Sequence, residues 1–379
     1  MHNLSSDPRL LALLWSLPLV LMAVLPASAK NRTLDASYKR IVFLGDSITD
    51  GNSYPTLIKE ALGDAGYDVP TCINAGIGGN RASQMRARLD RDVLVHHPSL
   101  VCVNAGVNDS FSVTPAAYEE DITAIVERLA KEKIACILVT PSILSADKKA
   151  AETNIVAFGA AMHRVAAKHG LKVAEVYKLM DEARTKGENV IEVDGIHPNY
   201  AGHRLITRAI LDAMGFTGVA VPAELRLSVM PGIITSWQMH PAPDATRLDA
   251  TTVAAVKPDA TWKTLTLPMA PLADEHWWTA GERKRGFAIG VDAVVGKSAH
   301  GFQGYAMLNA KKAKLAYFNP GSELLALWVN GKRVNTGDNT LGWHAGRERI
   351  PVQLLKGENV VIIETGNNFF LSVTDDNTW

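Results

Sequence analysis

The sequence of 379 residues is poor in features that mark several classes of protein. Its 39 basic and 39 acidic side chains give a formal net charge of zero, so there is no electrostatic reason to expect nucleic acid or an anionic membrane as a partner. No HExxH motif and no paired Cys/His spacing indicates a metal site. We therefore expect the protein to work without a metal or any other cofactor.

Cysteine is also scarce, with only Cys72, Cys102 and Cys136 present. Each of the three falls in a short apolar run that we interpret as a buried strand. Their odd number and these settings favour small apolar core residues over a disulfide framework.

The one long apolar run lies near the N-terminus, at residues 10–25 (LLALLWSLPLVLMAVL). It follows Arg9 and leads into a Pro-Ala-Ser-Ala exit that ends at Ala29. This pattern predicts a signal peptide over residues 1–29, cleaved after Ala29, and thus a secreted or periplasmic protein without stable membrane insertion. An uncleaved membrane anchor is the alternative, and Pro18 within the run argues against it.

Residues 30–216 alternate apolar runs with segments in which apolar residues recur every three or four positions. This alternation predicts an α/β domain with a parallel sheet covered by helices on both faces. The predicted strands cover 40–45, 71–74, 100–104, 134–140 and 172–176. The clearest predicted helices cover 54–66 and 115–132.

After a linker at residues 217–235, the pattern of apolar and turn-forming residues changes. Short β-like runs separated by turn signals, such as Asn330-Gly331, predict an antiparallel β-sandwich of jelly-roll type over residues 236–379. The predicted strands of this half include 261–267, 286–295, 324–329 and 359–364.

Four polar blocks follow predicted elements of the first half. GDS (45–47) ends the first strand, NAGIGGN (74–80) follows the second, NAGVND (104–109) follows the third, and VDGIHPNY (193–200) precedes the last helix. Ligands of open α/β sheets bind beyond the carboxyl ends of the strands, so we expect the four blocks to converge.

The residue types in these blocks suggest nucleophilic catalysis. Ser47 needs an adjacent base to become a nucleophile, and His197 can take and return a proton near neutral pH. Asp194 lies three residues before His197, and its carboxylate is placed to fix the tautomer of the imidazole ring. We therefore predict Ser47, His197 and Asp194 as the catalytic residues.

A developing oxyanion needs preorganised donors. The candidates are the N–H groups of Ser47 and Gly79 and the side-chain amide of Asn108, with Ser47 at a helix start that favours negative charge. Asp46 and Asp109 are interpreted instead as structural carboxylates that accept hydrogen bonds from backbone N–H groups.

Taken in order, the four blocks resemble those of the SGNH hydrolase superfamily, the GDSL-like serine esterases. Ser47, Gly79, Asn108 and His197 match the four residues that name the superfamily, with Gly78 as a one-residue alternative for the glycine. The resemblance covers about residues 38–216 and implies a flavodoxin-like three-layer α/β/α fold with no metal requirement. Ile48 replaces the leucine of the GDSL signature.

The second half resembles galactose-binding-like β-sandwiches, on the stretch LWVNGKRV and on residues 342–368 (GWHAGRERIPVQLLKGENVVIIETGNN). Tryptophan can stack on sugars, so Trp277, Trp278 and Trp343 are candidate substrate-binding residues. The alternative, which we favour, is that these side chains fill the sandwich core or its interface with the first half.

The expected function is that of an exported serine esterase that removes acyl groups, acetyl first among them, from a carbohydrate. The expected substrate is a small-molecule or polysaccharide ester. One alternative keeps the chemistry but takes a lipid ester or thioester as substrate. Another is a carbohydrate-binding protein without turnover, which the intact set of catalytic residues argues against.

Overall fold

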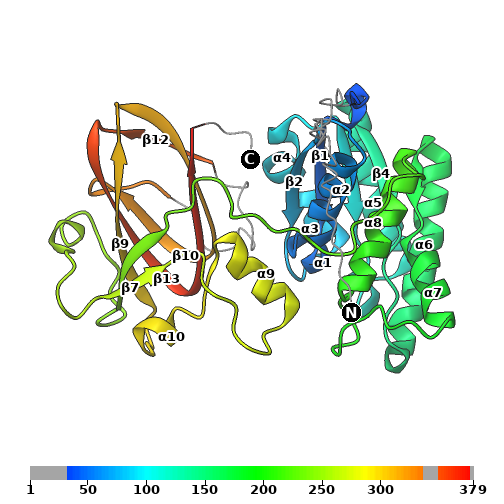
Figure 1. Ribbon diagram of the computed structural model, residues 1–379. Coiled ribbons are helices and arrows are strands. Elements are labelled where there is room, and N and C mark those ends of the chain that lie inside the picture. Colours follow the sequence, from blue (N-terminus) through cyan, green and yellow to red (C-terminus); the bar gives the residue numbers. More distant parts are fainter. Residues whose placement is uncertain (1–31, 336–348, 376–379) are drawn as a thin grey trace, which may run out of the picture.

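The computed structural model describes residues 32–335 and 349–375, which form an α/β half and a β half that lie side by side (Figure 1). The predicted signal peptide and Trp343 lie outside the described residues. Within those two ranges, no helix combines the length and apolar character needed to cross a membrane.

A five-stranded parallel sheet, in the order β2-β1-β3-β4-β5, forms the middle layer of the α/β half. The strands are β1 (Arg40–Gly45), β2 (Thr71–Gly76), β3 (Leu100–Asn104), β4 (Ala135–Val139) and β5 (Lys172–Ala174). The helices are α1 (Ser47–Asp50), α2 (Ser53–Asp64), α3 (Ala82–Ala87), α4 (Leu89–Asp92), α5 (Pro115–Lys131), α6 (Lys149–His169), α7 (Val176–Thr185) and α8 (Tyr200–Met214). The predicted α/β fold is confirmed.

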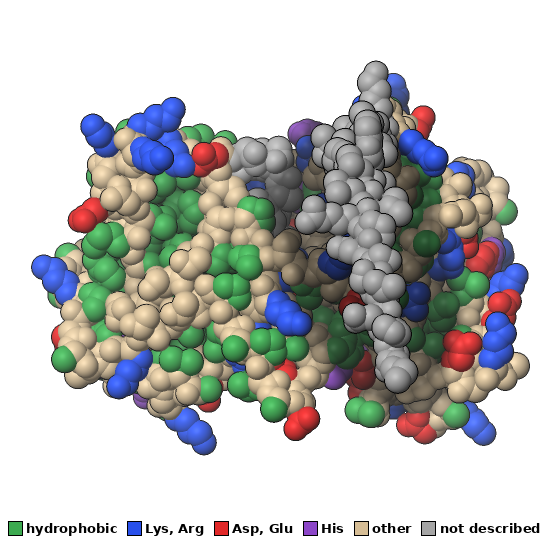
Figure 2. Space-filling view, in the orientation of Figure 1, with side chains coloured by type: hydrophobic (Ala, Val, Ile, Leu, Met, Phe, Trp, Pro, Cys, Tyr) green, Lys and Arg blue, Asp and Glu red, His purple; other side chains and the backbone are tan. Residues whose placement is uncertain are grey.

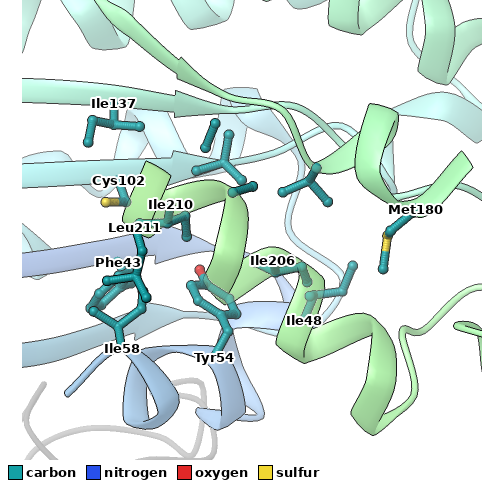
Figure 3. Close-up of a cluster of buried hydrophobic side chains, with 14 of the residues drawn as sticks. Phe43, Ile48, Tyr54, Ile58, Cys102, Ile137, Met180, Ile206, Ile210 and Leu211 are labelled. Atoms are coloured by element: carbon teal, nitrogen blue, oxygen red, sulfur yellow. The ribbon is translucent and has the colours of Figure 1, made fainter. Parts of the chain in front are cut away.

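The sheet separates two hydrophobic cores because successive strand residues point to opposite faces. In β1, Ile41 and Phe43 join the core that α2, α7 and α8 cover, which is drawn in Figure 3, whereas Val42 and Leu44 join the core under α3, α5 and α6. All three cysteines carry free thiols: Cys102 and Cys136 are buried, and Cys72 packs against the first core.

The β half is an antiparallel sheet of eight strands, with a main path β11-β10-β13-β9-β6-β7. Its elements are β6 (Ser236–Pro241), β7 (Lys263–Thr266), α9 (Trp277–Arg285), β8 (Ala288–Ile289), α10 (Asp292–Val295), β9 (Phe302–Ala310), β10 (Lys314–Val329), β11 (Lys332–Arg333), β12 (Ile350–Leu354) and β13 (Gly357–Thr374). The register between β10 and β13 shifts on both sides of Leu324, where such irregularities bend a strand. The sheet encloses a single large core, as expected of the predicted β-sandwich.

Two details of this half differ from the prediction. Residues 286–295 do not form one strand: Gly290 has a φ of +71°, and only the two-residue strand β8 and the short helix α10 form around it. The structure also has a helix, α9, that the sequence pattern did not predict. Figure 1 shows α9 on the side of the β half that faces the α/β half.

Candidate active site

Ser47 is the first residue of α1, directly beyond the end of β1. The side chain of Asp46 caps this helix, since its Oδ1 accepts a hydrogen bond from the Ile48 N–H at 3.0 Å. Gly45 permits the tight exit from the strand, because a Cβ at this position would lie 1.9 Å from Thr49 Oγ1. The local sequence thus holds Ser47 at the carboxyl edge of the sheet.

The side chains of Ser47, His197 and Asp194 form a continuous hydrogen-bonded line. Ser47 Oγ lies 2.8 Å from His197 Nε2, and His197 Nδ1 lies 2.6 Å from Asp194 Oδ2. The other carboxylate oxygen of Asp194 accepts the N–H groups of Ile196 and His197, at 2.8 and 3.0 Å. Burial raises the pKa of Asp194, but the hydrogen bonds from His197 and Ile196 outweigh it and keep this carboxylate ionised.

The loop that carries His197 and Asp194 is closed by main-chain hydrogen bonds. The N–H of Glu192 donates to the carbonyl of His197 at 2.8 Å, and the N–H of Gly195 donates to the carbonyl of Glu192 at 3.0 Å. A further bond runs from the Ser145 N–H to the carbonyl of Gly195. These bonds fix where the imidazole ring enters the site.

Two glycines were candidates for the second oxyanion donor, and the structure distinguishes them. The N–H of Gly78 donates to Asp50 Oδ2 at 3.1 Å, so it is already used within the protein. The N–H of Gly79 has no acceptor among the described residues, and no atom would lie within 4 Å of a Cβ placed there. Of the two, Gly79 has the N–H that is open to a ligand.

Asn108 lies close to these groups, and its side-chain amide already makes two hydrogen bonds. Its Nδ2 donates to Asp46 Oδ2 at 3.3 Å and to the carbonyl of Asn80 at 3.2 Å. The second distance lies at the long end of the usual range for N–H···O hydrogen bonds, and the first lies just beyond it. A developing negative charge would therefore compete well for this amide.

Asp46 and Asp109 are buried and accept backbone N–H groups, which confirms the interpretation of both as structural residues. Asp109 accepts the N–H of Ala82 with both carboxylate oxygens, at 3.1 and 3.3 Å. Burial raises the pKa of Asp46 to about 7 and that of Asp109 to about 6. Both carboxyls are therefore partly protonated near neutral pH.

Arg88 supports the active site through hydrogen bonds to β1 and β2, and the sequence did not predict this role. Its buried guanidinium donates to the carbonyls of Gly45 and Ala75 at 2.9 and 2.8 Å, to Asn80 Oδ1 at 2.8 Å and to Asp92 Oδ2 at 2.9 Å. It thus joins the ends of two strands to the block that carries Gly79. The only signal was an Arg–Asp pair four residues apart, a spacing equally typical of an exposed helix surface.

A cavity of about 430 Å³ opens beside Ser47 and His197. Helix α9 of the β half forms its far wall with Trp277 and Trp278, which are both half-buried. These two tryptophans lie at the interface with the α/β half, as one of the two sequence interpretations had it. The other lining residues are Ile48, Asp50, Gly51, Glu192, Val193, Asp194, Pro198, His203 and His276.

His203, on α8, is a second histidine beside this cavity. Burial, with a smaller effect from nearby His197, lowers the pKa of His203 to about 3. It is neutral at physiological pH, and Tyr54 stacks on its ring at a centroid distance of 6.3 Å. Within residues 32–335 and 349–375, no group of three or more His, Cys, Asp or Glu side chains is arranged to hold a metal ion.

Comparison with known proteins agrees with this architecture. Residues 43–205 match the GDSL-like Lipase/Acylhydrolase family. An acetylxylan esterase from Geobacillus stearothermophilus is 24% identical over 215 residues, which cover 48% of this chain and 97% of that protein. An arylesterase from Vibrio mimicus is 37% identical over 105 residues, or 26% of this chain and 49% of that protein.

Among solved structures, a lipase/acylhydrolase from Enterococcus faecalis is 26% identical with a TM-score of 0.43, covering 49% of this chain and all of that one. The chain described here is a carboxylic ester hydrolase with an α/β/α fold. The family domain found in its α/β half, over residues 43–205, is that of the GDSL-like lipases and acylhydrolases, also called SGNH hydrolases.

Proposed function

We propose that the protein hydrolyses acyl esters through a catalytic triad of Ser47, His197 and Asp194. The observation that carries this proposal is the hydrogen-bonded line of 2.8 Å from Ser47 Oγ to His197 Nε2 and 2.6 Å from His197 Nδ1 to Asp194 Oδ2. A serine in contact with a base, itself oriented by a carboxylate, is the arrangement that activates a hydroxyl as a nucleophile.

In the first half of the reaction, Ser47 Oγ attacks the ester carbonyl carbon while its proton passes to His197 Nε2. The carbonyl oxygen becomes an oxyanion that accepts hydrogen bonds from the N–H groups of Ser47 and Gly79 and from the Asn108 amide. His197 then gives the proton to the alcohol oxygen as the carbon–oxygen bond breaks. An acyl-enzyme remains on Ser47.

In the second half, water takes the place of the alcohol. His197 accepts a proton from the water as its oxygen attacks the acyl carbon, and returns that proton to Ser47 Oγ when the acyl–serine bond breaks. Asp194 stays ionised throughout and stabilises the imidazolium that forms in each half.

The proposed substrate is an acetyl ester of a carbohydrate, and the proposed site of action is outside the cytoplasm, after cleavage at Ala29. The relative named acetylxylan esterase, 97% of which this chain covers, supports the choice of acetyl as the acyl group and of a carbohydrate as the alcohol. The apolar run with its Ala-x-Ala exit supports export.

The test is hydrolysis of p-nitrophenyl acetate and p-nitrophenyl octanoate by the protein and by Ser47→Ala. Ser47→Ala should reduce kcat/KM by a factor on the order of 10³ or more, because the nucleophile is lost while the fold is kept. A preference for octanoate would favour the lipid-ester alternative instead. Equal activity of the variant and the parent protein would refute the mechanism.

A further inference from the structure

Helix α9 belongs to the β half by sequence, yet it closes the cavity beside the nucleophile. We propose that Trp277 and Trp278 form the part of the active site that selects the alcohol of the ester, and that this alcohol carries a ring with an apolar face. The inference rests on the proposed function, because it takes His197 as the group that protonates the leaving alcohol.

Both indole nitrogens are already used by the α/β half. Trp277 Nε1 donates to Glu192 Oε1 at 2.8 Å, and Trp278 Nε1 donates to the carbonyl of Gly51 at 3.0 Å. An indole with its N–H committed in this way is fixed in orientation. What the two rings offer to a ligand in the cavity is therefore apolar surface and not a hydrogen bond.

Other contacts hold the start of α9 in place. The ring of Trp277 meets Tyr200 and His203 edge-on, at centroid distances of 5.5 and 5.9 Å. His276 Nε2, from the residue that precedes the helix, lies 3.3 Å from the same Glu192 oxygen. The wall is thus formed before a substrate arrives, which reduces the entropy cost of binding.

The position of the cavity relates the wall to one side of the ester. Ser47 and His197 line the cavity, whereas Gly79 and Asn108 are not among its described lining residues. The oxyanion points toward Gly79 and Asn108 in the proposed mechanism, and the leaving oxygen lies against His197 Nε2. A cavity on the histidine side of the serine receives the alcohol.

A fixed aromatic wall suits a flat or ring-shaped group. The C–H face of a sugar ring and the face of an aryl ring both pack against an indole, and each gains contact area without needing its N–H. Methanol or ethanol as the alcohol would leave this wall uncovered. The wall therefore discriminates between ester substrates by their alcohol.

The test uses acetates that differ only in the alcohol: methyl acetate, phenyl acetate and a monoacetate of methyl xyloside. Trp277→Ala and Trp278→Ala should each lower kcat/KM about tenfold for a ring acetate and less than about twofold for methyl acetate. A loss with the xyloside alone identifies a sugar as the ring, and a loss with phenyl acetate alone identifies an aryl group. Trp277→Phe, which keeps an aromatic face, should give an intermediate loss.

Trp262→Ala is the matched control, since Trp262 is a half-buried tryptophan of the same half that packs beside His240. It should leave all three rates unchanged. Equal losses with all three acetates, or no loss with any, overturn the proposal. So does a changed preference for acyl length at a constant alcohol, because that result puts the acyl group against the wall.

A binding measurement separates this inference from the proposed chemistry. Calorimetric titration of Ser47→Ala with the xyloside acetate and with phenyl acetate needs no turnover, and adding Trp277→Ala should weaken binding of the ring acetate about tenfold. Unchanged binding of both ring acetates would overturn the proposal that the tryptophans contact the alcohol. Absence of Ser47-dependent hydrolysis in the parent protein refutes the triad and does not affect this result.

Discussion

Both halves of the molecule contribute residues to the active site, but the fold positions these residues in different ways. In the α/β half, Ser47, Gly79 and Asn108 follow three adjacent parallel strands, so the topology of the sheet alone brings them to one edge. The β half contributes one helix, α9, held by contacts to residues far away in the sequence. The bond from Trp278 to Gly51 spans 227 positions. Sheet topology makes the position of the strand-end residues predictable from the sequence, whereas no comparable rule predicts the position of α9.

The contacts that support the site also differ between the two halves in their exposure to solvent. The Arg88–Asp92 pair below the nucleophile is almost fully buried, with exposed side-chain fractions of 7% and 1%. The His276–Glu192 contact at α9 is open to solvent, with fractions of 50% and 20%. A solvated contact contributes much less than a buried network, so the His276–Glu192 contact is expected to add less to stability than the Arg88 network does.

The largest expected effect follows from removing the buried cation. Arg88→Met should lower the free energy of unfolding by about 3 kcal/mol or more, because it removes a buried cation and all of its hydrogen bonds to the Gly45 and Ala75 carbonyls, Asn80 and Asp92. Arg91 still contacts the Asp92 carboxylate in this variant. Urea unfolding measures the change. Arg86→Met is the matched control from the same segment: Arg86 is half-exposed and paired with Asp121, and the cost should stay below about 1 kcal/mol. Equal costs would contradict the distinction between the two arginines.

A smaller effect concerns the pH dependence of stability. The pKa of Asp46 is about 7 in the folded chain against a usual value of 3.8, so the folded state holds a proton that the unfolded state has lost between these values. The contribution of Asp46 to stability is therefore largest below pH 4 and is lost as the pH rises through 7. Asp46→Asn should remove this decline, which urea unfolding at several pH values measures.

His203 supplies a control of opposite sign. Its pKa of about 3 in the folded chain lies below the usual 6.5, so its contribution to stability is lost as the pH falls from 6.5 toward 3. His203→Gln should therefore reduce the loss of stability in acid, whereas Asp46→Asn should make that loss steeper. Identical pH profiles for the two variants would contradict both assignments.

The smallest effect is expected at the contact between the halves. Glu192→Gln keeps an oxygen that can accept the Trp277 indole N–H but removes the charge beside His276. The free energy of unfolding should change by less than about 1 kcal/mol, and by less still at high salt, with exposed Glu188→Gln as the control. A loss as large as that of Arg88→Met would show that α9 is held as firmly as the nucleophile.

The sequence predicted the α/β half well for an identifiable reason. Strands buried on both faces appear as continuous apolar runs, and the polar blocks that follow them stand out. Arg88 was missed because its spacing to Asp92 does not show whether the pair is buried. Helix α9 was missed because WWTAGERKR has no apolar periodicity, and its place depends on the capping side chain of His276 and on contacts across the interface.

The error at residues 286–295 has a related cause. The apolar residues of GFAIGVDAVV suit a strand, but Gly286 and Gly290 both adopt positive φ angles and break the extended run. Glycine in an apolar run is compatible with a strand or a turn, and only the surrounding structure decides between them.

The most direct test of the account is labelling of the intact protein with a fluorophosphonate, followed by peptide mapping. A fluorophosphonate reacts with a serine that an adjacent base has activated. The account predicts one adduct, on the peptide that contains Ser47, which is absent from Ser47→Ala and much slower to form in His197→Ala. A folded protein that takes up no label, or takes it up on another residue, would contradict the assignment of Ser47 as the nucleophile.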